Sequence, residues 1–296
     1  MEPAEMNLVE LKTRLSSSFK DRFILEGELG AGAFGLVVKA QQVALNRQVA
    51  IKFLLNKQAR HLEALKRFKR EAQTLANLRH PNIVQVFEFG KDSGIAFLVE
   101  ELLDGCSLRE YLSEFVSLSA DESIKIVKAL AKGLSLAHQN GIVHRDVKPA
   151  NVFICHNEYK LVDFGLVSTV TDETQITATN AVIGSPAYMA PEQFLGAEPS
   201  PSLDIYALGE LLFEMIAGCP PFSANDCGAL LTQKLNENAP PLNKIAKCEL
   251  PEGLADLVGS LLERRVDRRP TDCEELIGLL DDVASGRGYR SATVME

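Results

Sequence analysis

The segment His144–Asn151, with the sequence HRDVKPAN, combines residue types that can transfer a phosphoryl group. Asp146 is a carboxylate that can accept the proton of a hydroxyl group and orient that group for in-line attack. Lys148 can neutralise charge on the transferred group, and Asn151 can hold a metal ion. His144 by itself is typical of a buried histidine, and we predict that it packs and anchors the loop. Chance is a poor explanation for all eight residues together.

A second carboxylate follows at Asp163, in the sequence Asp163-Phe164-Gly165. Phosphoryl transfer uses Mg²⁺ to bridge the phosphates, and a carboxylate must hold the ion. Alone, the three residues are weak evidence of a metal site. Their position in the sequence relative to Asp146 makes this evidence strong. We therefore predict that Asn151 and Asp163 are the metal ligands.

Three further residues have predicted structural roles. Glu192, in Ala190-Pro191-Glu192, can form a salt bridge with Arg269. Asp204 opens a strongly apolar segment and can accept hydrogen bonds from the backbone of His144–Asn151, which we call the catalytic loop. These contacts would hold the loops that carry the chemistry.

A glycine-rich turn occurs near the N-terminus, with Gly30, Gly32 and Gly35 in the pattern G-x-G-x-x-G-x-V that ends at Val37. Glycine allows backbone N–H groups to approach phosphates closely. Alone, the pattern equally indicates a glycine-rich hairpin. A dinucleotide-binding turn would require the third glycine to open a helix, whereas Leu36–Lys39 continues as a strand.

Lys52 ends the sequence Val49-Ala50-Ile51-Lys52 in a predicted strand. A point cation there can bind the α- and β-phosphates of a nucleotide. Glu71 lies on the next predicted helix and can pair with Lys52. Taken singly, Lys52 is also explained as an exposed strand lysine, and Glu71 as a solvated glutamate in a charged helix.

These residues must be positioned by two different kinds of structure. The first hundred residues are predicted to be mostly strand, after a polar and partly helical leader over residues 1–20. Strand-like runs and one helical pattern follow one another at Phe23–Leu25, Leu36–Val38, Val49–Leu54, Leu62–Leu75 (helix), Ile83–Phe89 and Ile95–Val99.

After Asp104-Gly105 the pattern becomes mostly helical. Ser119-x-x-Glu122 and Thr271-x-x-Glu274 are capping boxes that open helices. Asp204–Ala217 is apolar almost all round and predicts a buried helix. Short strands are expected near Val152–Ile154 and Lys160–Val162, and Gly141 and Gly218 end helices. The predicted fold class is α+β and bilobal, with a small β-rich lobe that has one main helix, a larger mostly α-helical lobe and a ligand site between them.

Composition excludes several classes of protein. The chain has 296 residues and a formal net charge of −9, so it lacks the basic surface of a nucleic-acid binder. No run approaches the roughly 20 apolar residues of a membrane-spanning helix, and residues 1–15 do not form a secretory signal. The six cysteines lack zinc-site spacing and indicate reduced thiols in the cytoplasm.

Taken in order, the motifs between Phe23 and Leu280 resemble the protein kinase superfamily and, within it, the bacterial eukaryotic-like Ser/Thr kinases. Lys148 and Gly184-Ser185-Pro186 are similar to the Ser/Thr branch. The resemblance implies transfer of the γ-phosphoryl group of ATP, with Mg²⁺ or Mn²⁺, to Ser/Thr hydroxyls of proteins. It divides the chain into a leader (1–20), an N-lobe (21–101), a C-lobe (102–283) and a tail (284–296).

The resemblance also implies a nucleotide site. Its members would be the adenine-pocket residues Leu29, Val37, Ala50 and Phe153, the hinge residues Glu101, Leu102 and Leu103, and Ser107 near the ribose. Phe153 departs from the usual leucine. Glu100 falls on the gatekeeper position, where the family commonly has Met, Thr or Leu. We hypothesise that Glu100 reaches Lys52 or a water in the rear pocket, since burying a bare carboxylate is costly.

Regulation is predicted at Arg145, which can pair with a phosphate on the activation segment and order it. Thr177 and Thr179 are the expected autophosphorylation sites. A dimer would allow one copy to phosphorylate the other. Two alternatives stay open: a pseudokinase that acts as a binding module, and a small-molecule kinase on a similar fold. The presence of Lys52, Asp146 and Asp163 argues against the first, and the Ala-Pro-Glu segment argues against the second.

Overall fold

The computed structural model describes residues 6–32, 35–55, 62–156, 158–164 and 186–289. Within α3 it does not describe the side chains of residues 62–68 and 71. The described residues form two compact units, one up to Asp104 and one from Gly105 onward. Each unit is described by itself below.

The N-terminal unit contains a five-stranded antiparallel sheet in the order β1-β2-β3-β5-β4. Its members are β1 (Phe23–Gly32), β2 (Gly35–Gln42), β3 (Arg47–Leu54), β4 (Val86–Asp92) and β5 (Ile95–Glu101), with the helix α3 (Leu62–Asn77) and the 3₁₀ turn η2 (Val43–Leu45). The predicted strands and helix are confirmed. The fourth strand begins at Val86 rather than Ile83, because the Ile83 amide closes a turn onto the carbonyl of His80.

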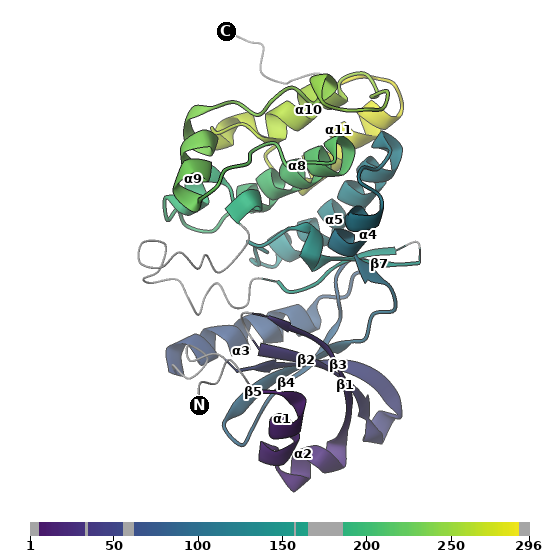
Figure 1. The fold of residues 1–296 in the computed structure, drawn as a ribbon, viewed down its shortest axis with the longest axis vertical. Helices are drawn as coiled ribbons and strands as arrows, with labels where there is room; N and C mark the ends of the chain where they lie inside the picture. Colours follow the sequence, from purple (N-terminus) through teal and green to yellow (C-terminus); the bar gives the residue numbers. More distant parts are fainter. Residues whose placement is uncertain (1–5, 33–34, 56–61, 157, 165–185, 290–296) are drawn as a thin grey trace. The chain divides into compact units, whose positions relative to one another are not determined.

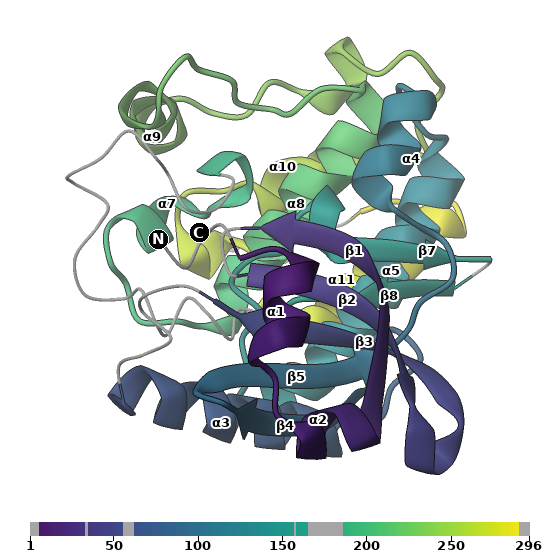
Figure 2. The same cartoon turned by 60° about the horizontal axis from the view of Figure 1, so that its bottom comes forward.

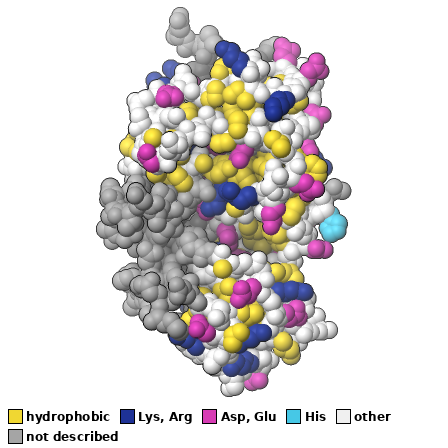
Figure 3. Space-filling view, in the orientation of Figure 1, with side chains coloured by type: hydrophobic (Ala, Val, Ile, Leu, Met, Phe, Trp, Pro, Cys, Tyr) yellow, Lys and Arg dark blue, Asp and Glu magenta, His cyan; other side chains and the backbone are white. Residues whose placement is uncertain are grey.

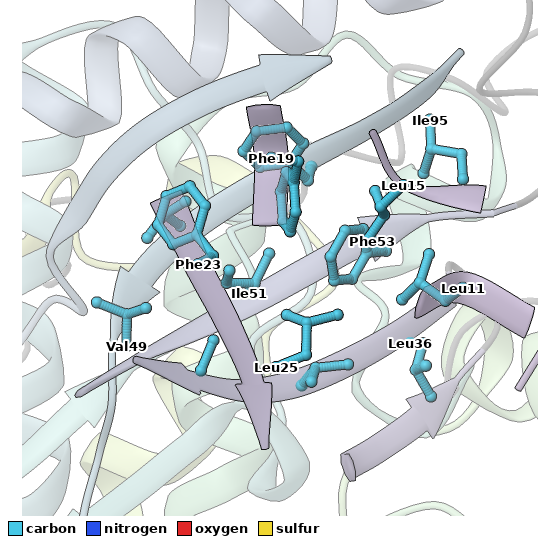
Figure 4. Close-up of a cluster of buried hydrophobic side chains, with 14 of the residues drawn as sticks. Leu11, Leu15, Phe19, Phe23, Leu25, Leu36, Val49, Ile51, Phe53 and Ile95 are labelled. Carbon is cyan, nitrogen blue, oxygen red and sulfur yellow. The ribbon is translucent and has the colours of Figure 1, made fainter. Parts of the chain in front are cut away.

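One face of this sheet is covered by two N-terminal helices, α1 (Leu8–Arg14) and α2 (Ser17–Arg22). Figure 2 shows α1 lying across the strands. Leu11 of α1, the C-cap residue Leu15 and Phe19 of α2 are buried in one cluster that includes Phe53 of the sheet (Figure 4). Phe97 belongs to the same cluster. The Phe19 ring centroid lies 5.1 Å from that of Phe97 and 5.9 Å from that of Phe53. The segment predicted as a polar leader therefore supplies part of the core of this unit.

The C-terminal unit is mostly helical (Figure 1). Its helices are α4 (Leu108–Glu114), α5 (Ala120–Gln139), α7 (Pro191–Phe194), α8 (Pro201–Ala217), α9 (Cys227–Asn236), α10 (Leu254–Leu261) and α11 (Cys273–Ala284). The short sheet β6-β7-β8 contains Cys106–Ser107, Val152–Cys155 and Glu158–Leu161. The 3₁₀ turns are η4 (Pro149–Asn151), η5 (Pro186–Tyr188), η6 (Leu242–Lys244) and η7 (Val266–Arg268). The predicted α+β class is confirmed.

Helix α8 runs through the core of this unit, packed against α5 and α10. Nearly all of its residues are buried, as its largely apolar pattern predicts. It ends at Gly218, whose φ of 75° lies in the left-handed region that glycine adopts without strain. None of the described helices is long and apolar enough to cross a membrane.

The N-cap predicted for α5 is confirmed, whereas the N-cap predicted for α11 is not. Ser119 caps α5, with its side chain accepting from the amide of Glu122. For α11 the predicted cap at Thr271 is wrong, because the next residue, Asp272, accepts from the amide of Glu275. A carboxylate is as good an N-cap as a hydroxyl, so two adjacent candidates competed.

Candidate active site

Asp146 is the centre of a hydrogen-bonded cluster in the C-terminal unit. Lys148 Nζ donates to both of its carboxylate oxygens, at 2.8 Å to Oδ1 and 2.6 Å to Oδ2. Asn151 Nδ2 donates to Oδ2 at 2.9 Å and to the Asp146 carbonyl at 2.8 Å. The Asp146 side chain keeps 31% exposure, so the carboxylate is held in one orientation and still reaches solvent. The three residues predicted for this centre are therefore brought together.

Asp204 accepts two hydrogen bonds from the backbone of the same loop. Its Oδ2 accepts from the amide of His144 and its Oδ1 from the amide of Arg145, each at 2.8 Å. Arg145 has a φ of 64°, a conformation that costs a non-glycine residue about 1–3 kcal/mol and persists only when its surroundings hold it. The predicted role of Asp204 is confirmed, and it explains how the loop keeps this shape.

His144 has the structural role predicted from its sequence context. Its ring is fully buried, lies 4.5 Å from the ring of Phe164 and shares a hydrogen bond with the Val162 carbonyl at 3.1 Å. Burial lowers the pKa of His144, although the nearby carboxylates of Asp204, Asp146 and Asp163 oppose this. A neutral imidazole donating to Val162 joins the catalytic loop to the strand that leads to Asp163.

A second histidine contacts Asp204, and sequence reasoning missed it. His138 Nε2 lies 2.8 Å from Asp204 Oδ2, and its Nδ1 lies 3.7 Å from the sulfur of Cys273. The order Cys–His–Asp matches a nucleophile triad, but Cys273 is only 1% exposed. Burial raises the pKa of the Cys273 thiol, which stays protonated. We therefore interpret His138 and Cys273 as residues that position Asp204, and not as a catalytic triad.

The predicted metal ligands lie on either side of the short β7–β8 hairpin. Asn151 ends η4 just before β7, and its carbonyl accepts from the amide of Val162 at 2.9 Å. Asp163 follows β8 and has a φ of 56°, in the left-handed region. Asn151 uses its amide NH₂ group toward Asp146, which leaves its side-chain oxygen for a cation. An amide oxygen and a carboxylate are the donors that Mg²⁺ prefers.

Phe153 and Ser107 are paired across β6 and β7. Both are partly exposed. The Ser107 hydroxyl donates to Glu110 Oε2 at 2.8 Å and accepts from the Glu110 amide, in a complete capping box that opens α4. The predicted ribose contact would have to share this hydroxyl with the helix cap.

An ion pair fixes the position of helix α7. Arg269, fully buried at its side chain, forms a two-pronged contact with Glu192 at 2.6 and 2.8 Å. The predicted pair is confirmed. Next to it, Gln193 Nε2 donates to the Arg145 carbonyl at 3.1 Å and so joins α7 to the catalytic loop. The sequence analysed alone offers no signal for Gln193.

In the N-terminal unit the glycine-rich motif lies on β1 and β2 and forms the predicted hairpin. Gly30 pairs with Val37, and Gly32 pairs with Gly35. Gly35 has a φ of 144°, and a Cβ there would lie 1.9 Å from the carbonyl oxygen of Phe53. Close packing of β2 on β3 therefore requires glycine at position 35. Leu29 is half exposed beside this motif.

Lys52 and Glu100 lie on the sheet face opposite the aromatic cluster. The register places Ala50 opposite Glu100 and Lys52 opposite Leu98, so the two charged side chains are diagonal neighbours on β3 and β5. Each is 9% exposed, and Ala50 is 8% exposed. The arrangement is compatible with the hypothesis that the two charges compensate each other.

The remaining predicted residues are placed only in part. Glu101 ends β5, where its amide donates to the Gln85 carbonyl at 2.9 Å, and Leu102 and Leu103 follow it partly exposed. The side chain of Glu71, on α3, lies outside the described residues. So do Thr177, Thr179 and Ser185.

Comparisons with known proteins agree with this geometry. The model of the protein kinase domain family matches residues 23–278. A probable serine/threonine-protein kinase PknB of Lactococcus lactis is 34% identical over 92% of this chain and 43% of its own length. The serine/threonine-protein kinase PrkC of Bacillus subtilis is 38% identical over 72% of this chain and 33% of its own length. The chain thus spans less than half the length of these relatives.

A solved structure is similar as well. The crystal structure of the Mycobacterium tuberculosis PknI kinase domain superimposes with a TM-score of 0.72 at 28% identity, covering 89% of this chain and 96% of that one.

Proposed function

The chain belongs to the protein kinase family, and from this premise we propose that it is an active Ser/Thr protein kinase. It would transfer the γ-phosphoryl group of ATP to serine and threonine hydroxyls of acceptor proteins. The names of the relatives, which are serine/threonine-protein kinases, support this activity.

The observation that carries the proposal is the cluster of Asp146, Lys148 and Asn151. A carboxylate that reaches solvent and is oriented by two donors can accept the proton of an acceptor hydroxyl. Lys148, which holds that carboxylate, would also neutralise charge on the phosphoryl group. A binding module without activity has no need for this arrangement. Asp204 stabilises the loop that carries it by accepting two backbone hydrogen bonds.

A divalent cation fits the donor set of the C-terminal unit. Asn151 and Asp163 would hold Mg²⁺ or Mn²⁺, which supplies charge neutralisation on the phosphates. Lys52 and the backbone of Gly30, Gly32 and Gly35 would bind the phosphates. Glu71 would position Lys52.

The rest of the nucleotide site is proposed from the family pattern. The base would lie against Leu29, Val37, Ala50 and Phe153, with Glu101 and Leu103 as the hinge and Ser107 near the ribose. Glu100 would stabilise the ammonium of Lys52 from β5. A Glu100→Met variant tests this, and unchanged ATP affinity and activity would exclude a role for Glu100.

The wider setting of the kinase is also proposed. Arg145 would pair with a phosphate at Thr177 or Thr179, placed there by a second copy in a transient dimer. All six cysteines are free thiols, which suits the reducing cytoplasm. On the face drawn in Figure 3, the described Lys and Arg side chains are interspersed with Asp and Glu, which argues against a nucleic-acid partner there. We keep the boundaries 1–20, 21–101, 102–283 and 284–296 as proposed divisions.

The experiment that tests the proposal is phosphoryl transfer from Mg-ATP to a generic acceptor protein, with the acceptor and the chain both analysed by mass spectrometry. We expect phosphoserine and phosphothreonine on the acceptor, and loss of both in an Asp146→Asn variant that binds ATP normally. No transfer with Mg²⁺ or Mn²⁺ by the unmodified chain would instead support a scaffold. Phosphorylation of small metabolites alone would support a small-molecule kinase.

A further inference from the structure

Lys234 is a lysine with no exposed side-chain surface in the C-terminal unit. It lies on α9, and its ammonium donates to Glu210 Oε1 at 2.9 Å, to the carbonyl of Ala187 at 2.5 Å and to the carbonyl of Met189 at 2.9 Å. A lysine ammonium has three donors, and all three are used. Glu210, on α8, is equally buried.

The two carbonyls belong to the segment Pro186–Ala190, which we call the platform segment. Ala187 and Met189 are held by Lys234, and Tyr188 between them donates from its hydroxyl to Glu214 Oε2 at 2.5 Å. Three successive residues are therefore held by contacts with α8 and α9. Pro186, Ala187 and Met189 remain partly exposed.

The position of the platform segment in the chain connects it to the site. It leads directly into α7, where Glu192 binds Arg269 and Gln193 donates to the carbonyl of Arg145 in the catalytic loop. The platform segment is therefore continuous with a helix whose residues contact the catalytic loop and Arg269.

Stability alone does not explain the pair. Removing an ammonium and a carboxylate from water is costly, and well-packed apolar residues often replace such a pair without loss of stability. Lys234 also lies against the rings of Tyr206 and Phe222, at 5.1 and 5.9 Å from their centroids, so an apolar side chain could pack there. What an apolar side chain cannot do is bind two backbone carbonyls at once.

We propose that Lys234 and Glu210 are a positioning pair that fixes the backbone of the platform segment in the shape that binds the acceptor protein. This inference rests on the proposed kinase function. Glu210 holds the ammonium in place, and the ammonium holds Ala187 and Met189. Neither residue touches the reacting atoms, so the effect is on acceptor binding rather than on the phosphoryl group.

The test uses the double variant Lys234→Met/Glu210→Leu, which replaces both charges with apolar groups of similar size. We expect it to fold, with a thermal midpoint only slightly below that of the unmodified chain, because the carbonyls of Ala187 and Met189 lie in a partly exposed segment and can bind water instead. The KM for an acceptor protein should rise about tenfold, because uniform acceptor binding is weakened. The KM for ATP, and ATP hydrolysis without acceptor, should not change. The control is Lys128→Met, which removes the lysine paired with Asp281 between α5 and α11, and it should leave every one of these values unchanged.

A second measurement does not depend on activity. Amide hydrogen exchange in residues 187–190 should become about tenfold faster in the double variant, while exchange in α5 stays the same. Unchanged exchange together with an unchanged acceptor KM would overturn the inference. Unfolding of the double variant would also overturn it, because the pair would then serve stability.

The two proposals fail in different ways. If the unmodified chain transfers no phosphoryl group at all, the proposed function fails, and hydrogen exchange still decides whether Lys234 and Glu210 hold the platform segment. If transfer is normal in the double variant and exchange is unchanged, only the positioning role fails.

Discussion

The two units bury different kinds of side chain. In the described part of the N-terminal unit, Lys52 and Glu100 are the only buried charged residues, and the core is a cluster of aliphatic and aromatic side chains. The C-terminal unit buries Asp204, Glu210, Lys234 and Arg269. The difference follows from what each unit has to hold in place.

A sheet satisfies its own backbone hydrogen bonds, so the strands of the N-terminal unit need only a non-directional apolar core. The catalytic loop and the platform segment have no such ladder. Their buried amides and carbonyls must find partners elsewhere, and Asp204 and Lys234 supply them. The buried charges Asp204 and Lys234 of the C-terminal unit therefore mark loops whose shape matters, and the predictions below test this difference between the units.

The largest effect is expected from Asp204→Ala in the C-terminal unit. This change leaves the amides of His144 and Arg145, and His138, without their acceptor, so the free energy of unfolding should fall by about 3–5 kcal/mol. Urea unfolding at neutral pH measures it. Asp204→Asn keeps an oxygen acceptor and should lose less. A loss below about 1 kcal/mol for Asp204→Ala would mean that the charge does not hold the loop.

A comparable loss is expected from Phe19→Ala in the N-terminal unit, but for a different reason. Phe19 is 2% exposed and contacts three other aromatic rings, so the variant leaves a cavity that costs about 3–4 kcal/mol. Val9→Ala on α1 is the control, because Val9 is 73% exposed and should change stability by less than about 0.5 kcal/mol. Equal effects of the two variants would show that α1 and α2 are not part of the core.

The sequence predicted well those residues that stand in a dense pattern. Asp146, Asn151 and Asp163 lie in short motifs whose spacing restricts their chemistry, and the roles of Asp204 and Arg269 followed from their order in the chain. The strands of the N-terminal unit could be predicted because alternation along each strand is a local property.

Residues that act through distant contacts could not be predicted in this way. Lys234 has the sequence context of an ordinary helix-surface lysine, and only the fold brings it to Glu210. A signal did exist at Glu210, an acidic residue in the middle of a largely apolar helix. Similarly, Leu11, Leu15 and Phe19 recur every four residues, but the polar residues between them concealed an apolar stripe that folding buries against the sheet.

A smaller effect is expected from the titration of Glu210. Burial raises the pKa of Glu210 to about 7, against the opposing effects of Lys234 and the Tyr206 hydroxyl, while Glu214 on the same helix raises it further. Between the unfolded value of 4.5 and about 7, the folded chain holds a proton that the unfolded chain has released. The contribution of Glu210 to the free energy of unfolding therefore falls as pH rises through this range.

The matched variant is Glu210→Gln, which cannot titrate. Between pH 5 and pH 7 the difference in unfolding free energy between the unmodified chain and this variant should change by about 2 kcal/mol, in the direction of lower stability of the unmodified chain at pH 7. Chemical denaturation at several pH values measures this difference. Parallel pH profiles for the two proteins would show that Glu210 stays ionised, as an exposed glutamate would.

The smallest effect concerns Ser16, whose hydrogen bonds to Asp92 join α2 to β4. Its hydroxyl donates to Asp92 Oδ1 at 2.5 Å and accepts from the Phe19 amide, and its own amide donates to Asp92 Oδ2 at 2.8 Å. Ser16→Ala removes the N-cap of α2 and one bond to Asp92 but keeps the amide contact, so we expect a loss of about 1 kcal/mol. Ser17→Ala, at the adjacent exposed position, should be nearly neutral. A loss as large as that of Phe19→Ala would show that hydrogen bonds, rather than the aromatic cluster, hold these helices, and the contrast between the two units would no longer stand.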